Sequence, residues 1–348
     1  MGLDIGTSGV RAAELRPGRS GPVLERFGQV ALPPGAVQDG EVVDPPAVAA
    51  ALRGLWTQAR FGTRSVVVGV ANQKVVVRQV DLPWLPPAEM RASLAFQVQD
   101  SIPMAVEHAL LDYHPLEERT DDAGARQLRV LLVAAARGMV DATLQAVTLA
   151  GLTPAVVDLT SFAVVRAHAH TDSGFRAQRT EALIDVGSSV TNIVVHQGGV
   201  PRFVRILLMG GADVTAAVAE RLGVPTEQAE ALKQSSSLTP VAGTDDATLT
   251  QRAMETAGAA FVEEVRGTLD YFLAQSGSGA IHRIVLSGGG SRLAGLAERL
   301  ASATRLPVDP ARPLELLALG RTGLTEEQLA YAEPVMCVPV GLGLGVAA

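Results

Sequence analysis

The stretch Leu3-Asp4-Ile5-Gly6-Thr7-Ser8-Gly9-Val10 opens the chain, and a matching stretch, Ile184-Asp185-Val186-Gly187-Ser188-Ser189-Val190-Thr191, occurs in its second half. Each copy has an aspartate between two apolar residues, then a glycine and two hydroxyl residues, and each continues into apolar residues that suit a returning strand. A glycine in such a turn can adopt positive φ, and the backbone N–H groups around it can converge on an anion. Two copies, one in each half, predict two similar domains that hold one nucleotide between them.

The composition limits the classes of protein to which this chain can belong. With 348 residues, the chain is longer than a typical domain of about 100–200 residues, so we expect at least two domains. Hydrophobic residues make up 47% and charged residues 19%, which indicates a globular chain and excludes a disordered one. The net charge of −7, without a Lys/Arg cluster, argues against a nucleic-acid partner. A single cysteine, Cys337, excludes an internal disulfide and fits a reducing cytoplasm.

The sequence does not predict direct membrane insertion. It has no run of about 18 uncharged apolar residues, which a spanning helix requires. The first residues, with Asp4 and several glycines, are typical of a strand and turn rather than of a secretory signal. The apolar tail Val338–Val346 lacks basic residues, so we expect a buried final element rather than a membrane-surface helix.

Apolar spacing predicts the strands around the first turn. Asp4–Ile5 and Val10–Leu15 are expected to pair around Gly6, with Val23–Ala31 as a third strand. Further along, the β-branched runs Ser65–Val70 and Val75–Val80 are separated by four residues, and this pattern predicts a hairpin.

The two turns supply candidate ligands for a phosphate and a metal ion. Their glycines, hydroxyl residues and one arginine are the candidate phosphate contacts: Gly6, Thr7, Ser8, Arg11, Gly187, Ser188, Ser189 and Thr191. An aspartate two residues before each glycine is better suited to hold Mg²⁺ through its water shell than to bind phosphate, which makes Asp4 and Asp185 the candidate metal residues. An ordinary Asp/Gly/Ser turn is the competing interpretation, and the repeat weakens it.

A third glycine-rich segment, Ser287-Gly288-Gly289-Gly290-Ser291-Arg292, lies between a predicted strand and a predicted helix. The N-terminus of that helix favours a phosphate or ribose-phosphate group. The segment matches neither the dinucleotide G-x-G-x-x-G spacing nor the P-loop pattern, and alone it is equally typical of a plain strand–turn–helix junction. Its candidate cofactor residues are Gly288, Gly289, Gly290 and Ser291.

These three segments, in this order, resemble the actin-like ATPase superfamily, in which the first two loops are phosphate motifs and the third is the adenosine motif. The resemblance implies an α/β fold of two domains, each built on a ribonuclease-H-like sheet, with ATP and Mg²⁺ as cofactors in the cleft. It covers most of the chain and implies the order of the subdomains: a first actin-like subdomain at 1–80 and 152–179, an inserted α+β subdomain at 81–151, a second actin-like subdomain at 180–214 and 278–348 whose last helix returns to the first, and a small helical subdomain at 215–277.

The same resemblance suggests further site residues. Gly210 and Gly211 follow a strand after the second turn, where relatives place glycines near the phosphates. Glu230 and Lys233 resemble a Glu-x-x-Lys step whose side chains contact ribose and base, although a surface ion pair is the alternative. Asp158 lies in the segment that joins the halves, where catalytic relatives position the attacking group, and a capping or turn aspartate is its alternative.

The inserted segment narrows the choice of family within this superfamily. It begins at Leu82-Pro83 and is similar to the α+β module of the cell-division protein FtsA and of the PilM family of type IV pilus assembly proteins. Similarity to the PilM family lies in Pro87-x-Glu89-Met90, in Gln97-x-x-x-Ser101-Ile102-Pro103, in Asp112-Tyr113 and in Val133-Ala134-Ala135-Ala136-Arg137. FtsA normally ends in a basic amphipathic helix, which this sequence does not show.

This resemblance implies a cytoplasmic ATP-binding scaffold with weak ATPase activity at most, recruited to the inner membrane in a pilus or related type II secretion machine. Its expected partner is the N-terminal cytoplasmic peptide of a PilN-like inner-membrane protein, held in a groove between the inserted unit and the first actin-like subdomain. Two alternatives stay open at this point: a small-molecule phosphotransferase of the sugar-kinase branch, and an FtsA-like filament-forming protein. Self-association and contacts with other pilus components stay open with them.

Overall fold

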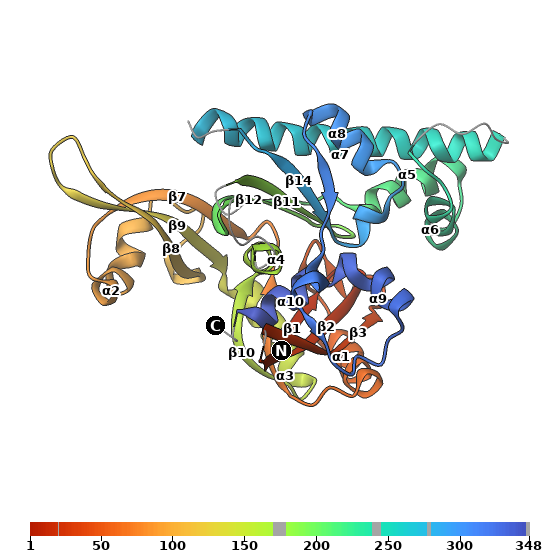
Figure 1. The fold of residues 1–348 in the computed structure, drawn as a ribbon, viewed down its shortest axis with the longest axis horizontal. Coiled ribbons are helices and arrows are strands. Elements are labelled where there is room, and N and C mark those ends of the chain that lie inside the picture. Colours follow the sequence, from red (N-terminus) through yellow and green to blue (C-terminus); the bar gives the residue numbers. More distant parts are fainter. Residues whose placement is uncertain (20, 170–178, 239–244, 277–279, 346–348) are drawn as a thin grey trace.

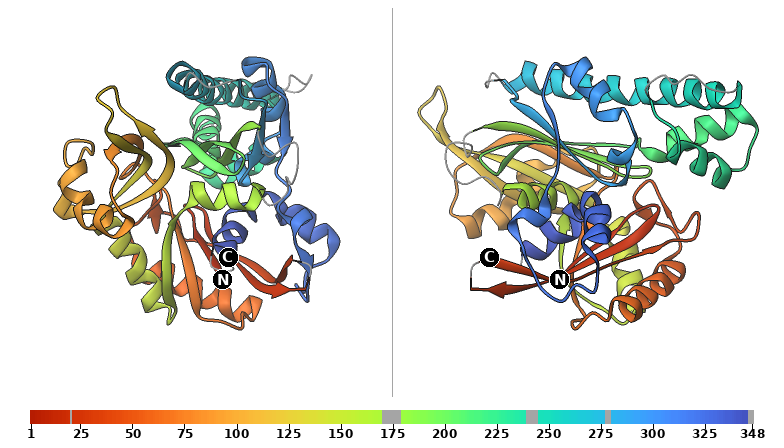
Figure 2. Two further views of the ribbon diagram at one scale, coloured as in Figure 1. Left: turned by 60° about the vertical axis from the view of Figure 1, so that its left-hand side comes forward. Right: turned by 45° about the vertical axis from the view of Figure 1, so that its right-hand side comes forward.

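The computed structural model describes residues 1–19, 21–169, 179–238, 245–276 and 280–345. Two large sheets form the two halves of the molecule, and helices α4 (Thr160–Ala169) and α10 (Cys337–Leu344) lie between them (Figure 1 and Figure 2). A smaller sheet projects to one side of both halves (Figure 1).

The sheet of the first half contains the first glycine turn. Its first three strands form an antiparallel meander, while the fourth and fifth run parallel to the first. Asp4 lies opposite Arg11 across the first pair. In spatial order the strands are β10 (Thr153–Leu159), β6 (Ser65–Val70), β1 (Gly2–Ile5), β2 (Gly9–Gly18), β3 (Gly21–Ala31) and β16 (Ala318–Leu319).

The sheet of the second half repeats this arrangement around the second turn. Here too an antiparallel meander of three strands is followed by two strands parallel to the first. Numbered by their order in the chain, the five strands that the sheets share have the spatial order third–second–first–fourth–fifth in both, as expected for a duplicated unit. The first sheet has β16 as a sixth strand beside β3. The strands are β13 (Val200–Leu207), β12 (Thr191–Gln197), β11 (Thr180–Val186), β14 (Arg283–Ser287) and β15 (Val308–Pro310).

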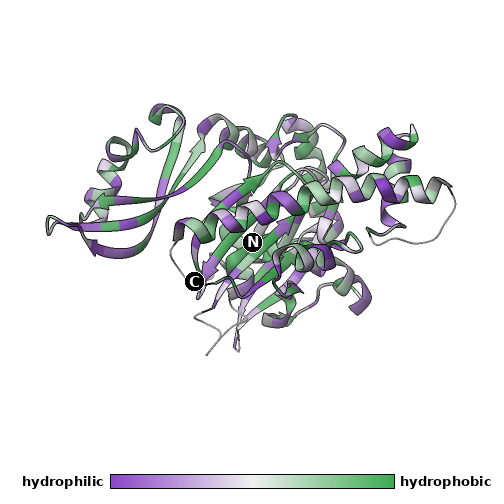
Figure 3. Ribbon diagram, turned by 90° about the horizontal axis from the view of Figure 1, so that it is seen from above, coloured by the Kyte–Doolittle hydropathy of each residue, from purple (hydrophilic) through white to green (hydrophobic). Residues whose placement is uncertain are grey.

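Helices cover the outer faces of both sheets. In the first half, α1 and α3 bury Leu52, Leu55 and Val147 in one cluster with Leu3 of β1. In the second half, α7 crosses above the strands, and its apolar and polar residues alternate along its length (Figure 3). These helices are α1 (Pro45–Ala59), α3 (Arg137–Leu149), α5 (Gly211–Leu222), α6 (Thr226–Gln234), α7 (Asp245–Ser276) and α8 (Leu296–Thr304).

The third sheet corrects one prediction from the sequence. We expected Ser65–Val70 and Val75–Val80 to pair as a hairpin, and this was wrong: β6 pairs with β1 and β10, whereas β7 (Val75–Pro83) pairs with β9. The chain therefore passes from the large sheet to the small one between these strands. The small sheet has the order β7, β9 (Arg126–Ala136), β8 (Ala109–Thr120), and α2 (Pro87–Val98) packs against it. We call this segment, from β7 to β9, the inserted unit.

The apolar tail is buried from Val338 to Leu344, as predicted, while Gly345 is exposed and Val346 lies outside the described residues. Every residue of α10 is buried, and the helix packs against β1, β2 and α4. One core cluster contains Phe27 of the first sheet, Leu183 of the second and Leu342 of α10, so the two halves share a core through α4 and α10. The limits of the four subdomains given by the resemblance remain a proposal.

Short elements complete the described chain: β4 (Val37–Gln38), β5 (Glu41–Val42), α9 (Glu326–Ala332) and the 3₁₀ helices η1 (Val106–His108), η3 (Gly289–Arg292), η4 (Pro313–Leu316) and η5 (Glu333–Val335). Among the described residues, no helix combines the length and the apolar character that crossing a membrane requires.

Close packing of α10 gives a first test. A Cβ atom at Gly341 would lie 1.8 Å from the carbonyl oxygen of Ala163, so Gly341→Ala should lower the free energy of unfolding by about 1–3 kcal/mol. The matched control is Gly54→Ala in α1, where a Cβ would meet nothing within 4 Å, and alanine should there raise that free energy by about 0.5–1 kcal/mol. Urea unfolding of both variants measures the difference, and equal effects would contradict this packing.

Candidate nucleotide-binding site

The two glycine turns have the same backbone geometry. In the first, the N–H of Gly6 donates to the carbonyl oxygen of Gly9 at 3.0 Å. In the second, the N–H of Gly187 donates to the carbonyl oxygen of Val190, also at 3.0 Å. Each turn joins the first two strands of its sheet, so the structure places both phosphate candidates at equivalent positions of the two halves.

The two aspartates lie on opposite halves, and the charge of Asp4 affects the pKa of Asp185. Asp185 is buried, and its Oδ1 accepts a hydrogen bond of 2.8 Å from the hydroxyl of Ser287. Burial, and to a smaller extent the nearby charge of Asp4, raise the pKa of Asp185 to about 6. Burial also raises the pKa of Asp4, although the guanidinium of Arg11 opposes that shift. Two converging carboxylates that resist ionisation are suited to a divalent cation, which would favour their charged forms.

Arg11 connects the first turn with this carboxylate pair. Its Nη1 lies 3.3 Å from Oδ2 of Asp4, and its Nη2 is 3.5 Å from the hydroxyl of Ser8. Its Nε is buried without a hydrogen-bond partner among the described residues. An unpaired buried donor is costly, so this atom fits a site completed by an anionic ligand. The charge of Arg11 thus complements a phosphate beside the metal candidates.

The third glycine segment packs on the second turn. Gly288 has a φ of +84°, and a Cβ there would lie 2.3 Å from the carbonyl oxygen of Val186. A Cβ at Gly290 would lie 2.4 Å from Cγ1 of the same valine. Glycine is therefore required for this loop to approach β11, immediately before Gly187. The hydroxyl of Ser291 donates to the carbonyl oxygen of Gly288 at 2.7 Å, so it closes the loop itself.

Gly210 and Gly211 hold the second turn in place. A Cβ at Gly210 would lie 2.5 Å from the carbonyl oxygens of both Gly187 and Ser188. The N–H of Gly211 donates to the carbonyl oxygen of Gly187 at 3.0 Å, at the start of α5. Thr191 is fully buried and donates its hydroxyl to the carbonyl oxygen of Met209 at 2.7 Å, so the structure gives it a supporting contact rather than a place in the open site.

Glu230 and Lys233 lie beside these glycines. The ammonium group of Lys233 donates to the carbonyl oxygen of Gly211 at 3.0 Å and to Oε2 of Glu230 at 2.7 Å. Burial raises the pKa of Glu230, but hydrogen bonds from Lys233, Thr215 and Gln234 outweigh it and lower that pKa below its ordinary value. The pair therefore adjoins the second phosphate candidate and also forms an ion pair, in which Lys233 is mostly buried rather than on the surface as the alternative interpretation had it.

Asp158 is engaged elsewhere. Its carboxylate forms an ion pair with Arg166, and its Oδ1 accepts from the backbone N–H of Leu159 at 2.7 Å. Arg166 in turn donates from Nε to the carbonyl oxygen of Gly341 at 2.9 Å. Asp158 thus stabilises the contact of α4 with α10, and no described contact joins it to the glycine turns.

Sequence reasoning did not single out Arg292, although it follows the third glycine segment directly. Its guanidinium lies 4.1 Å from the ring centroid of Tyr331 and donates to the backbone carbonyl of the same residue. Burial lowers the pKa of Arg292, and the nearby charge of Arg11 adds to that shift. Two arginines from the first and third loops therefore lie close together. Because residues 11 and 292 are far apart in the sequence, no local pattern could predict that these two arginines affect each other.

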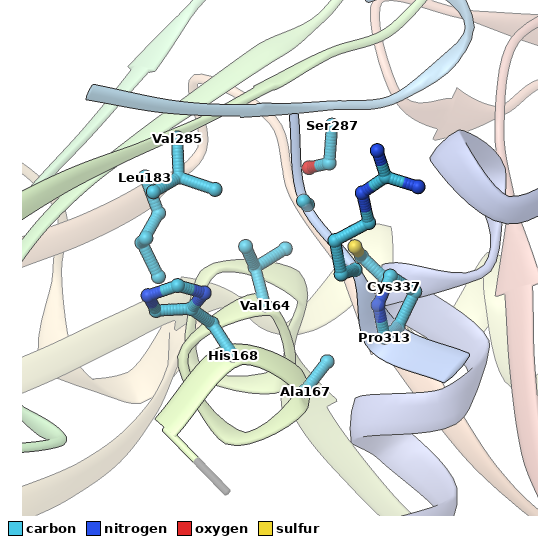
Figure 4. A pocket seen from close by; sticks show the side chains of 10 residues that line it. Val164, Ala167, His168, Leu183, Val285, Ser287, Pro313 and Cys337 are labelled. Carbon is cyan, nitrogen blue, oxygen red and sulfur yellow. The ribbon is translucent and has the colours of Figure 1, made fainter. Parts of the chain in front are cut away.

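A polar cluster beside the site ties α4 to the second sheet. Nε2 of His168 on α4 lies 2.9 Å from Oε2 of Glu181, and Nε2 of His196 lies 3.4 Å from the same oxygen. Nδ1 of His196 accepts from the N–H of Gly199, which leaves the proton on Nε2 and favours a hydrogen-bonded cluster over metal ligation. His168 also faces a small pocket with Leu183, Val285 and Cys337, between the two halves (Figure 4).

Comparisons with known proteins agree with this architecture. The family model described as "Type IV pilus assembly protein PilM" matches residues 2–346. A solved chain of a "PilM-PilN type IV pilus biogenesis complex" is similar at 28% identity and a TM-score of 0.86, with 100% of this chain and 98% of that chain covered. Together with the two repeated sheets, this confirms the predicted two-domain actin-like fold.

More distant structures show the fold alone. The ethanolamine utilization protein EutJ from Carboxydothermus hydrogenoformans is 14% identical with a TM-score of 0.53, covering 99% of this chain and 88% of that chain. MreB 5 of Spiroplasma citri, solved with AMPPNP bound, is 11% identical with a TM-score of 0.52, covering 99% of this chain and 94% of that chain.

The raised pKa of Asp185 gives a test of the site without any ligand. Above pH 6 the folded protein must bury this carboxylate ionised, whereas the unfolded chain ionises it freely from about pH 4. Asp185→Asn should therefore raise the free energy of unfolding at pH 8 by about 1–3 kcal/mol. The gain should shrink as the pH falls to 5, because the native carboxyl then takes up a proton.

Urea unfolding at both pH values measures this, with Asp141→Asn at an exposed position of α3 as the control for the loss of one negative charge. A destabilised Asp185→Asn at pH 8 would contradict the electrostatic account of the site.

Proposed function

The chain belongs to the family of type IV pilus assembly proteins PilM, and from this we propose that it is an ATP-binding scaffold that holds a PilN-like inner-membrane protein. The observation that carries the nucleotide part of the proposal is the convergence of Asp4 and Asp185 from the two halves, with Arg11 beside them. The partner part rests on the family and on the similarity to a chain solved in a PilM–PilN complex.

The residues of the site fit a magnesium nucleotide. Asp4 and Asp185 would hold Mg²⁺ through its water shell, and backbone N–H groups around Gly6 and Gly187 would face the phosphates. When bound, the metal would neutralise phosphate charge and the repulsion between the two carboxylates. The third loop, from Gly288 to Ser291, with Glu230 and Lys233, would face the adenosine end.

The partner peptide would bind beside the outer strand of the first sheet. β10 is at the end of the strand order, and its apolar residue Val156 is 45% exposed. Leu149, the last residue of α3, is 49% exposed. An extended peptide can add to such an open strand and place apolar side chains against it. We propose that a PilN-like N-terminal peptide occupies this edge, and thereby brings the protein to the cytoplasmic face of the inner membrane.

A scaffold role agrees better with the site than phosphate transfer does. A phosphotransferase needs a carboxylate base aimed at the reacting group. The candidate for that role, Asp158, is paired with Arg166 in a contact that supports α4 and α10. We therefore expect ATP turnover far below the enzyme range of about 1–10³ per second. Family membership also favours the scaffold over the phosphotransferase and filament alternatives.

Binding of ATP should depend on Mg²⁺ and on Asp185. In calorimetry at pH 8, Asp185→Asn should weaken ATP binding in the presence of Mg²⁺ by about tenfold or more, because one of the two metal carboxylates is lost. Without Mg²⁺ the variant should bind ATP as well as the wild type or better. For the wild type, affinity in Mg²⁺ should fall below pH 6, where Asp185 takes up a proton. Equal affinities for wild type and variant in Mg²⁺ would remove the proposed site.

Binding of the partner peptide should depend on the exposed strand edge. Val156→Asp should abolish binding of a labelled PilN-like N-terminal peptide in fluorescence anisotropy, because a charge would face the apolar groove. Val43→Asp is the matched control, since Val43 is 55% exposed and lies before α1, away from β10. If both variants bind the peptide like the wild type, the groove lies elsewhere.

A further inference from the structure

The outer strand of the second sheet, β13, contains a β-bulge. Its pairing with β12 shifts so that Val195 faces Phe203 and His196 faces Pro201, which leaves Arg202 without a partner across the ladder. A bulge re-aims the side chain of its extra residue and bends the strand. Arg202 is thus the extra residue of β13, at the edge of the second sheet that faces the inserted unit.

The extra residue contacts the inserted unit. Nε2 of Gln79 on β7 donates to the backbone carbonyl of Arg202 at 2.6 Å. His114 on β8 is close to the guanidinium: burial lowers its pKa, and the charge of Arg202 lowers it further. Nε of Arg202 is itself buried without a hydrogen-bond partner in the described part of the chain. The inserted unit therefore touches the second half of the molecule at the bulge.

Apolar packing extends this contact along β13. Ile206 packs against the cluster formed by Val70, Val75 and Met139, which joins the first sheet, the inserted unit and α3. On its other side, α3 packs against α1 and β10 of the first half. In Figure 1 the small sheet lies beside the second sheet while α3 lies below it, at the first. The inserted unit and α3 therefore bridge the two halves.

The other end of β13 reaches the nucleotide site. Just beyond the strand, the carbonyl oxygen of Met209 accepts the hydroxyl of Thr191, and Gly211 donates to the carbonyl oxygen of Gly187 in the second turn. Gly210 is in close contact with the same turn. From Arg202 to Gly210 an extended chain covers about 25 Å. One strand thus has the phosphate loop at one end and the inserted unit at the other.

We propose that β13 couples nucleotide binding to partner binding, through the contact of the Arg202 bulge with Gln79 and His114. This inference rests on the proposed function. A nucleotide that fixes the second turn also fixes β13, and the bulge then fixes the inserted unit against the second half. Because α3, which ends at Leu149 of the proposed peptide edge, packs against both β10 and β9 of the inserted unit, a fixed unit preorganises that edge, and the peptide binds more tightly.

The test compares peptide affinities with and without nucleotide. A fluorescein-labelled peptide with the N-terminal cytoplasmic residues of a PilN-like protein is titrated with the full chain, with and without saturating Mg-AMPPNP. In the wild type, nucleotide should lower the peptide Kd by about fivefold or more. In Gln79→Ala, which removes the donor to the Arg202 carbonyl, the ratio of the two Kd values should fall to about one, while nucleotide affinity without peptide stays within about twofold of wild type.

Gln127→Ala is the matched control. Gln127 donates its amide to Asp121 at 3.1 Å within the inserted unit, so its loss leaves the contact with β13 intact, and the wild-type ratio should persist. His114 gives an independent readout: Arg202→Ala should raise the pKa of its imidazole, measured by NMR titration, because the neighbouring charge is removed.

The outcomes distinguish a failure of the proposed function from a failure of the coupling. A wild type that binds neither ATP nor peptide would overturn the proposed function. A wild type that binds both, with equal peptide Kd values in the presence and absence of nucleotide, would overturn only the coupling. The same holds if coupling persists undiminished in Gln79→Ala, since the hydrogen bond to the Arg202 carbonyl would then be broken without effect.

Discussion

The removal of two acidic side chains from water, one in each half, is the constraint on which the arrangement of this molecule depends. Asp4 and Asp185 come from opposite sheets, and both have raised pKa values because burial disfavours their ionised forms. Without a cation, their charges oppose the approach of the two halves. Something else must hold the halves together in the absence of ligand, and the structure provides it in α4 and α10.

These two helices carry the apolar contact between the halves. Leu183 of the second sheet and Phe27 of the first belong to one core cluster with α4 and the fully buried α10. Polar contacts fix the helices in it: Arg166 joins Asp158 to the backbone of Gly341, and His168 meets Glu181 of β11. The halves therefore share a hinge that is stable by itself, while the loops above it hold unfavourable charge that a magnesium nucleotide would relieve. Binding energy at the loops can then act on the relative position of the halves.

Sequence patterns predicted the pairing of strands that are close together in the chain. The Asp–x–Gly turns fixed the positions of β1, β2, β11 and β12, because a glycine turn between two apolar runs determines its own pairing. The β-branched runs at Ser65–Val70 and Val75–Val80 predicted strands but not their partners, and they lie in different sheets. Ser287 beside Asp185 is a contact between residues far apart in sequence, and the bulge at Arg202 is a shift of register, and side-chain periodicity encodes neither. Thr191, predicted from the sequence as a candidate phosphate contact, is the first residue of β12, and its hydroxyl donates to the carbonyl oxygen of Met209.

The position of the inserted unit gives this fold a use for nucleotide that needs no fast chemistry. The unit enters between β6 and β10 of the first sheet, yet its strands β7 and β8 contact the bulge of the second. A unit attached to both halves must respond to any change in their relative position, whether or not a phosphate is transferred. With Asp158 engaged by Arg166, the proposed scaffold role makes hydrolysis the weaker of the two consequences that nucleotide binding would have. We propose that the stronger is mechanical, because β13 runs from the Arg202 bulge to Leu207, and Gly210 and Gly211, which hold the second phosphate turn, follow shortly after it.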